Sequence, residues 1–165
     1  MSARWWAGRV RQFVRYLTGR VSRSERAQLR AWLTPAQLDL FDEMHSADKR
    51  HGLDVVQALR SAGHSDPDLL IAGLLHDSGK ARSLRLWHRI GWSVSEHYDG
   101  RVRSTARRLP TFTTAFATLA AHAERSAELA LAAGCSPRAA DLIRHQAEPT
   151  DQELGVALRL ADEAS

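Results

Sequence analysis

The sequence predicts an all-α protein, and three observations lead to that prediction. Apolar residues recur at intervals of three and four along most of the chain, which is the spacing of one face of a helix. Alternation with a period of two, typical of half-buried strands, is absent, and β-branched residues are sparse. Proline and glycine punctuate the ends of several periodic segments. A chain of 165 residues with 44% hydrophobic residues then fits one helical domain with its own core.

The first predicted helix covers residues 4–31 and is strongly basic. Residues 1–30 hold eight arginines and one glutamate, a net charge of +7, so the rest of the chain contributes −3 to the total of +4. The charge shift separates a basic amphipathic segment, residues 1–33, from a helical domain, residues 34–165. The apolar face of the first helix consists of Trp6, Val10, Phe13, Val14, Leu17 and Val21.

The start of the second predicted helix has the sequence of a capping box. Thr34 stands at the N-cap, Pro35 follows in the first turn, and Gln37 occupies the third position. We expect a helical region from there to about residue 62, with a break near residues 45–49, and Gly63 as its end.

The next predicted helix opens at Asp66-Pro67-Asp68, carries His76-Asp77 and stops at Gly79. Helices are then expected over residues 82–98, over 99–109 up to Pro110, and over the alanine-rich stretch 113–133. Gly134 ends that stretch, and Ser136-Pro137 starts a helix that reaches about Gln146. After Pro149, Thr150 or Asp151 starts the last helix.

Six histidine and aspartate side chains are expected to face inward. His76-Asp77 follows a continuous apolar run, so the pair should emerge from a buried helix. A buried carboxylate beside a buried imidazole is costly unless both are paired or bind a cation. Several such residues therefore favour a metal site assembled from more than one helix. The full set is His51, His76, Asp77, His122, His145 and Asp162.

Three ordered elements carry a family resemblance. Three stretches stand in the order found in HD-domain proteins. They are Asp48-Lys49-Arg50-His51, then Leu74-Leu75-His76-Asp77-Ser78-Gly79-Lys80, and last Leu158-Arg159-Leu160-Ala161-Asp162. The chain resembles this superfamily of metal-dependent phosphohydrolases from about residue 48 to residue 162. The resemblance implies an HD-type helical bundle, with the basic N-terminal helix as an accessory.

The resemblance also implies a ligand set. His51, His76, Asp77 and Asp162 would hold one divalent transition metal, for which Mn, Fe, Co, Ni and Zn are all suitable. His122 and His145 resemble the extra histidines of binuclear members and would hold a second ion, with Asp77 as the bridge. Gln146 stands where those members have another histidine, so sites with one ion and with two ions both remain open.

The expected activity is hydrolysis of a nucleotide or another small phosphoester by metal-activated water. Asp77 would serve the chemistry through the metal, and Lys80 would meet a phosphate, although a solvated lysine at a helix end is equally consistent. Asp48 is either a partner of the His51 ring or a plain solvated acid, and Glu148 is a weak candidate for a proton shuttle. The GYP signature of the cyclic-dinucleotide branch is absent, so that substrate is not assigned.

Two other classes of function remain open. A non-catalytic sensor or regulatory module would keep a metal and hydrolyse nothing. A scaffold associated with a membrane or with nucleic acid would hold a structural metal. The basic helix, residues 1–30, would cover the core, lie on an anionic membrane surface, or bind nucleic acid.

The amino-acid composition also indicates where in the cell the protein is expected. The single cysteine, Cys135, suggests a reducing compartment, and no stretch approaches ~18 consecutive apolar residues. We therefore expect a cytoplasmic protein, peripheral at a membrane if the basic helix binds one. The subunit number is not predicted.

Overall fold

The computed structural model describes residues 20–80 and 121–165, and these ranges form helices without strands. The prediction of an all-α fold is therefore confirmed for the described chain. The predicted helices over 82–98 and 99–109, and most of 113–133, lie outside the described residues. The described helices are α2 (Arg23–Leu29), α3 (Pro35–Glu43), α4 (Ser46–Ser61), α5 (Pro67–Leu75), α9 (His122–Ala132), α10 (Pro137–Arg144) and α11 (Leu154–Ala164).

The predicted helix ends are confirmed at several points. The Thr34 hydroxyl accepts from the Gln37 amide, and the Gln37 side chain accepts from the Thr34 amide, which is the predicted capping box. The expected break falls between α3 and α4, where the His45 ring accepts from the Ala47 amide at 3.2 Å and caps α4. Gly63 ends α4 with a φ of +90°, and Gly134 ends α9 with a φ of +79°. This region of backbone conformation favours a residue without a Cβ.

Three boundaries differ from the prediction. The N-terminal stretch 4–31 was expected as one helix; residues 4–19 lie outside the described residues, and α2 begins at Arg23, after Ser22, which forms a capping box with Glu25. The helix carrying His76-Asp77 ends at Leu75 rather than at Gly79. The last helix starts at Leu154 because the Asp151 carboxylate accepts from the amides of residues 153 and 154 and holds a turn first. At each of these boundaries, a hydrogen bond to a nearby side chain or the packing against other helices sets where the helix begins or ends, and the spacing of apolar residues does not.

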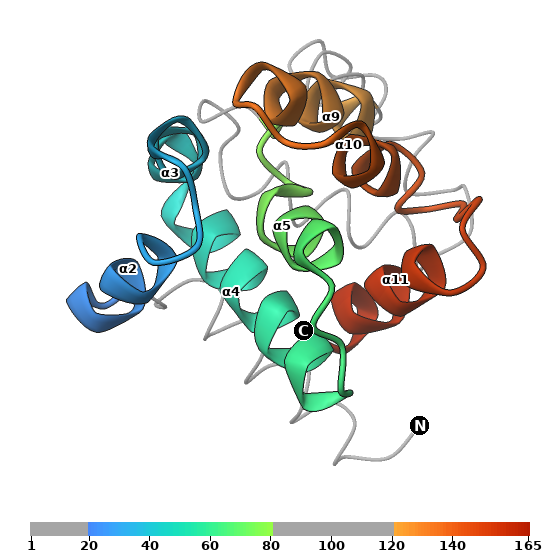
Figure 1. The fold of residues 1–165 in the computed structure, drawn as a ribbon, viewed down its shortest axis with the longest axis horizontal. Coiled ribbons are helices and arrows are strands. Elements are labelled where there is room, and N and C mark those ends of the chain that lie inside the picture. The colour runs from blue at the N-terminus through green and yellow to red at the C-terminus, as the bar shows by residue number, and fades with distance from the viewer. Residues whose placement is uncertain (1–19, 81–120) are drawn as a thin grey trace, which may run out of the picture.

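Helix α5 is central to the arrangement (Figure 1). It packs against α4, α10 and α11, and more lightly against α3. Its residues Leu69, Leu74 and Leu75 are fully buried, in agreement with a helix that is apolar on all sides. Because the chain leaves α5 inside the core, the residues that follow it start from a buried position.

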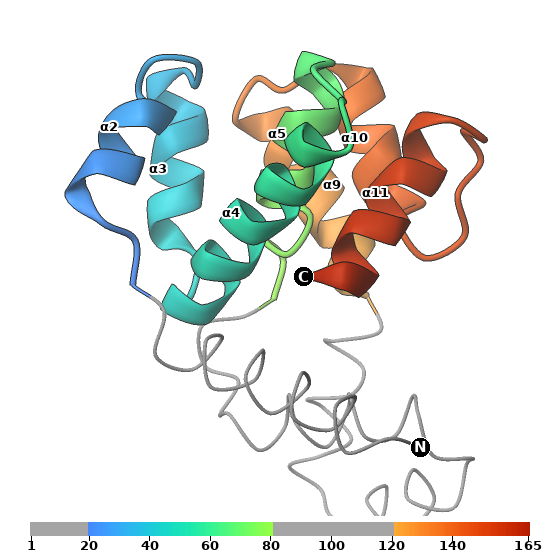
Figure 2. The ribbon, with the colours of Figure 1, turned by 90° about the horizontal axis from the view of Figure 1, so that it is seen from below.

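Helix α2 docks on the flank formed by α3 and the start of α4 (Figure 2). Leu29 belongs to the common core, the Arg26 guanidinium pairs with Asp42 on α3, and Arg50 on α4 pairs with Glu25 at 2.6 Å. The described part of the basic segment is therefore packed onto the helical domain through both apolar contact and ion pairs.

Candidate metal centre

The His76-Asp77 pair lies in the turn that follows α5, and each side chain is only 2% exposed. The His76 amide still donates to the Ala72 carbonyl at 2.9 Å, so the backbone of His76 continues the helix. Its Nδ1 lies 3.0 Å from the Gly73 carbonyl oxygen. A carbonyl oxygen only accepts, so Nδ1 carries a proton and donates it. Nε2 is then the nitrogen that faces the other polar side chains, as is usual for a metal-binding histidine.

Side chains from four parts of the chain meet around that nitrogen. His51 Nε2 on α4 lies 2.6 Å from Asp162 Oδ1 on α11. The same Asp162 oxygen lies 3.3 Å from His76 Nε2, which is 3.5 Å from Asp77 Oδ1. His122 Nε2, at the first residue of α9, is also 3.5 Å from Asp77 Oδ1. Five of the six predicted ligands therefore form one contiguous cluster.

Part of this cluster has the spacing of a group that could hold a metal ion. One ligand atom each from His51, His76 and Asp77 lies within 4.8 Å of the other two. Neighbouring ligands on a metal at ~2.1 Å are roughly 3.0–3.4 Å apart, close to the separations of 3.3 and 3.5 Å around His76 Nε2. The 2.6 Å between His51 Nε2 and Asp162 Oδ1 is instead a hydrogen-bond distance, so these two side chains would have to separate to bind one ion. Among the described residues, Asp77 Oδ1 is buried without a hydrogen-bond partner. A buried oxygen of this kind is costly unless a cation or a donor satisfies it.

A close approach of α4 to α5 brings His51 to His76. Gly52, next to His51, packs so tightly that an added Cβ would lie 2.4 Å from the Leu74 carbonyl oxygen. Only a residue without a Cβ permits this distance between the two helix backbones. The sequence signal for this contact is an isolated glycine within a helical pattern, which hydrophobic periodicity alone does not reveal.

A second close approach brings Asp77 to His122. Gly79 lies against the first turn of α9, where an added Cβ would be 2.5 Å from the His122 carbonyl oxygen. The Gly79 amide donates to the Ser126 hydroxyl at 2.8 Å, and Ser126 is fully buried. Gly79 was predicted to end the helix, whereas its role in the structure is to dock the 76–80 turn onto α9.

The charges of the cluster shift its pKa values. Burial lowers the pKa of His76, but the negative charges of Asp77 and Asp162 outweigh burial and raise it to about 9. Burial acts to raise the pKa of Asp77, and the charges of His76 and then Lys80 overcome it and lower that pKa well below its usual range. The pKa of Asp162 is lowered in the same way, chiefly by His76 against the effect of burial. Both carboxyl groups are therefore anionic and attract cations.

Lys80 and Asp48, which each had two interpretations from the sequence, have defined surroundings in the structure. Lys80 Nζ lies 2.6 Å from Asp77 Oδ2, and its side chain is 23% exposed. Its predicted contact with a phosphate stays a prediction, but the lysine is not simply solvated. Asp48 is completely buried, so the interpretation of a solvated acid is wrong.

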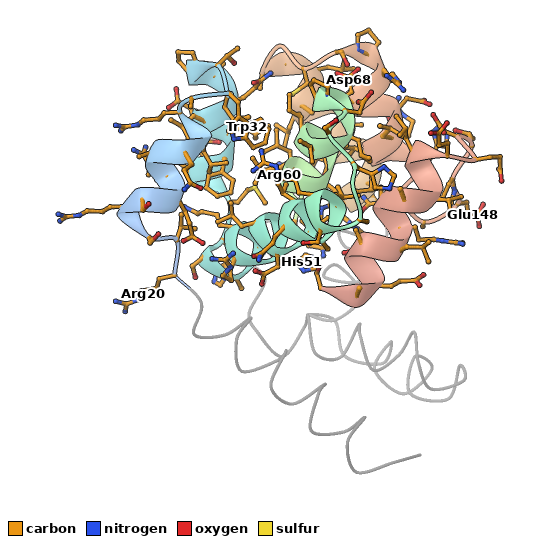
Figure 3. The ribbon with its side chains drawn as sticks, turned by 60° about the horizontal axis from the view of Figure 1, so that its bottom comes forward. Arg20, Trp32, His51, Arg60, Asp68 and Glu148 are labelled. Atoms are coloured by element: carbon orange, nitrogen blue, oxygen red, sulfur yellow. The ribbon has the colours of Figure 1, made fainter. Side chains whose placement is uncertain are left out.

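The sixth predicted ligand, His145, is placed differently. Its Nδ1 lies 3.1 Å from the Asp141 carbonyl oxygen and 3.2 Å from the Asp141 carboxylate, both on its own helix. No contact within the described ranges joins its ring to Asp77 or His122. The neighbouring Gln146 instead approaches the site, where its amide donates to the His76 carbonyl at 3.3 Å. Glu148 is exposed on the loop after α10, and no described contact links it to the cluster (Figure 3).

One side of the cluster is accessible to solvent. The side chain of Asp162 is 39% exposed, whereas those of His51 and His76 are 17% and 2% exposed. Figure 3 shows His51 on the stretch of α4 beside α11. Asp162 is therefore the most exposed of these side chains, and His76 and Asp77 are the buried ones.

Comparisons of the sequence with protein-family models and with curated proteins, and of the fold with solved structures, gave no match. Within the described ranges, no helix combines the length and the apolar character needed to cross a membrane.

Proposed function

We propose that this protein is a metal-dependent phosphohydrolase that acts on a nucleotide or another small phosphoester. His51, His76, Asp77 and Asp162 would hold the metal ion. One observation carries the proposal: two imidazole Nε2 atoms and two carboxylate oxygens from α4, the α5 turn and α11 converge on one place, and Asp77 Oδ1 is buried there without a hydrogen bond from a described residue.

A bound divalent ion would lower the pKa of a coordinated water towards ~7 and offset negative charge on a phosphoryl group. Several side chains of the protein suit this chemistry. Asp77 and Asp162 supply two negative charges, and the Gly73 carbonyl fixes the tautomer of His76. His122 and Lys80 surround Asp77 with donors that suit an anionic substrate. The exposure of Asp162 leaves a route by which that substrate would enter.

The test measures metal content and hydrolysis on the same preparations. Protein purified without chelator is examined by elemental analysis, and it is then assayed against a panel of nucleotides and simple phosphomonoesters and phosphodiesters. Asp77→Asn keeps the shape of the side chain and removes its charge. Asp39→Asn is the matched control, since it removes a carboxylate from the exposed side of α3, outside the cluster.

We expect about one metal equivalent and measurable hydrolysis in the wild-type protein and in Asp39→Asn, and loss of both in Asp77→Asn. Negligible metal after reconstitution with Mn, Fe, Co, Ni or Zn would refute the proposal. Metal binding without hydrolysis of any substrate in the panel would instead favour the non-catalytic binding module.

A further inference from the structure

The outward side of α2 carries exposed arginines. Arg23, Ala27 and Arg30 are exposed and follow one another at intervals of four and three residues, so they lie on one face of the helix and its C-cap. Arg20, just before the helix, is exposed as well. Among the described residues, no carboxylate forms an ion pair with any of these three arginines. Their charges are therefore open to an anion outside the protein.

The opposite side of α2 fixes the direction of these arginines. Leu29 is 2% exposed and belongs to the common core. The Arg26 guanidinium pairs with Asp42 on α3, and the Glu25 carboxylate accepts from Arg50 on α4 at 2.6 Å. The Arg50 side chain is only 11% exposed, so this contact is well inside the interface. The exposed arginines are therefore part of the folded surface and point away from the domain.

The described domain is electrically asymmetric. Residues 20–30 hold four arginines and one glutamate, a net charge of +3, whereas residues 31–80 and 121–165 hold eight basic and sixteen acidic residues, a net charge of −8. Helices α2 and α11 lie at opposite ends of the arrangement in Figures 1 and 2, and Figure 3 shows Arg20 and Glu148 at opposite ends. The exposed acids at the α11 end are Glu148, Glu153 and Glu163.

This asymmetry selects one orientation at an anionic surface. The surface attracts the α2 end and repels the α11 end, so the protein would approach it with α2 first. Neither the metal cluster nor hydrolysis is needed for this approach. The orientation depends only on the charges of α2 and of the acidic end.

The sequence that directly precedes α2 favours a lipid surface over nucleic acid. Residues 1–19 add four arginines and no acidic residue, and they also contain Trp5, Trp6 and Phe13. Nucleic acid attracts a protein through its phosphates and requires cationic side chains. An interfacial segment combines cationic side chains with tryptophan and phenylalanine, which enter the boundary between headgroups and acyl chains. The composition next to the α2 arginines is of this second kind.

From these observations we propose that the outward side of α2 is a docking surface for an anionic lipid bilayer. Arg20, Arg23 and Arg30 contact the lipid headgroups, and the acidic α11 end faces away from the membrane. The inference goes beyond the proposed function and does not depend on it.

The experiment measures binding of the full-length protein to sedimented vesicles. Phosphatidylcholine vesicles with about 30% phosphatidylserine are compared with vesicles of phosphatidylcholine alone. Fluorescence anisotropy with a labelled DNA duplex and a labelled single-stranded RNA, at the same ionic strength, tests the alternative partner. The test variant combines Arg20→Gln, Arg23→Gln and Arg30→Gln.

A matched control removes the same amount of charge elsewhere on the surface. It combines substitutions at three exposed arginines of α9, α10 and α11, namely Arg125→Gln, Arg138→Gln and Arg159→Gln. Circular dichroism checks that both variants are folded.

We expect the wild-type protein and the control to bind the anionic vesicles and not the neutral ones. The α2 variant should bind at least about tenfold more weakly, because each arginine near the surface adds to the attraction. Added salt should weaken wild-type binding by screening the charges.

Three outcomes would overturn the inference. The first is absence of wild-type binding to the anionic vesicles. The second is an equal loss of binding in the α2 variant and the control, which would mean that net charge alone attracts the protein. The third is tighter binding to DNA or RNA than to the vesicles, which would make the surface a nucleic-acid site. If the α2 variant does not fold, the wild-type measurements on the vesicles and on nucleic acid decide the matter.

Discussion

His51 Nε2 lies 2.6 Å from Asp162 Oδ1, although the two residues are 111 positions apart in the sequence. The contact joins the second turn of α4 to the last turn of α11. Asp162 also reaches His76 at 3.3 Å, so this one carboxylate connects the ring from α4 with the ring that follows α5. The last helix thus completes a cluster whose other members belong to the middle of the chain.

Loss of the Asp162 charge should weaken metal binding. Asp162→Asn keeps an oxygen at the site but removes one of its two negative charges, and we expect the affinity for Mn²⁺ to fall by at least about tenfold. Titration calorimetry on chelator-stripped protein measures the change. Glu163→Gln alters the charge of the adjacent residue, whose side chain is 64% exposed, and should leave the affinity unchanged. Equal effects of the two substitutions would place Asp162 outside the metal centre.

A methyl group at Gly52 should separate α4 from α5. Alanine favours a helix over glycine by ~1 kcal/mol, but its Cβ would lie 2.4 Å from a backbone oxygen that cannot move independently of α5. We therefore expect Gly52→Ala to destabilise the fold by roughly 1–3 kcal/mol and to lower metal affinity, since His51 moves with its helix. Urea unfolding and Mn²⁺ titration test both parts.

Gly73→Ala is the comparison for that variant. Gly73 is also helical, but the nearest atoms to an added Cβ belong to the flexible side chains of Leu59 and Val55, at 2.9 and 3.1 Å. Those side chains can shift, so the cost should be smaller than for Gly52→Ala. A Gly73 variant that is the less stable of the two would contradict the assignment of Gly52 as the contact that sets the helix separation.

Ser126 should position the turn that carries Asp77. Ser126→Ala removes the acceptor of the buried Gly79 amide and leaves that donor unsatisfied, which costs about 1–3 kcal/mol. Because the turn loses its tie to α9, hydrogen exchange at the Gly79 amide should also accelerate. Ser61→Ala changes an exposed serine at the end of α4 and should alter stability by less than about 0.5 kcal/mol. An unchanged exchange rate in Ser126→Ala would show that the turn holds without this bond.

The Glu25–Arg50 pair should make stability depend on pH in the acid range. The hydrogen bond from Arg50, followed by that from the Ser22 amide, lowers the pKa of Glu25 from 4.5 to about 2. A lowered folded-state pKa gives a contribution that is complete above pH 4.5 and is lost as the pH falls towards 2. Since the Glu25 side chain is 32% exposed, solvent screening limits that contribution to about 1 kcal/mol.

Glu25→Gln isolates this effect, because glutamine keeps the capping box and loses the charge. Urea unfolding of both proteins should show the wild type more stable at pH 6, with the difference shrinking as the pH approaches 3. A difference that stays constant across this range would mean that the ion pair does not hold the Glu25 pKa down.

Much of the candidate site was predictable because its polar residues interrupt apolar helical faces. That pattern selected His51, His76, Asp77, His122 and Asp162, and the structure brings all five together. It also selected His145, whose ring contacts Asp141 instead. Periodicity tells which face of a helix a residue occupies, but it does not tell which partner the side chain meets when a neighbouring residue on its own helix offers a hydrogen bond.

The sequence by itself determined the all-α class, the capping box at Thr34, the glycine ends of α4 and α9, and the burial of the His76-Asp77 pair. These features depend on interactions within a few residues or on the apolar face of a single helix. Tertiary structure decided the close approaches at Gly52 and Gly79, and the division of the Asp77 carboxylate between the imidazoles and Lys80. Such features depend on distances between helix backbones far apart in the chain, and those distances are set only when the whole core packs together.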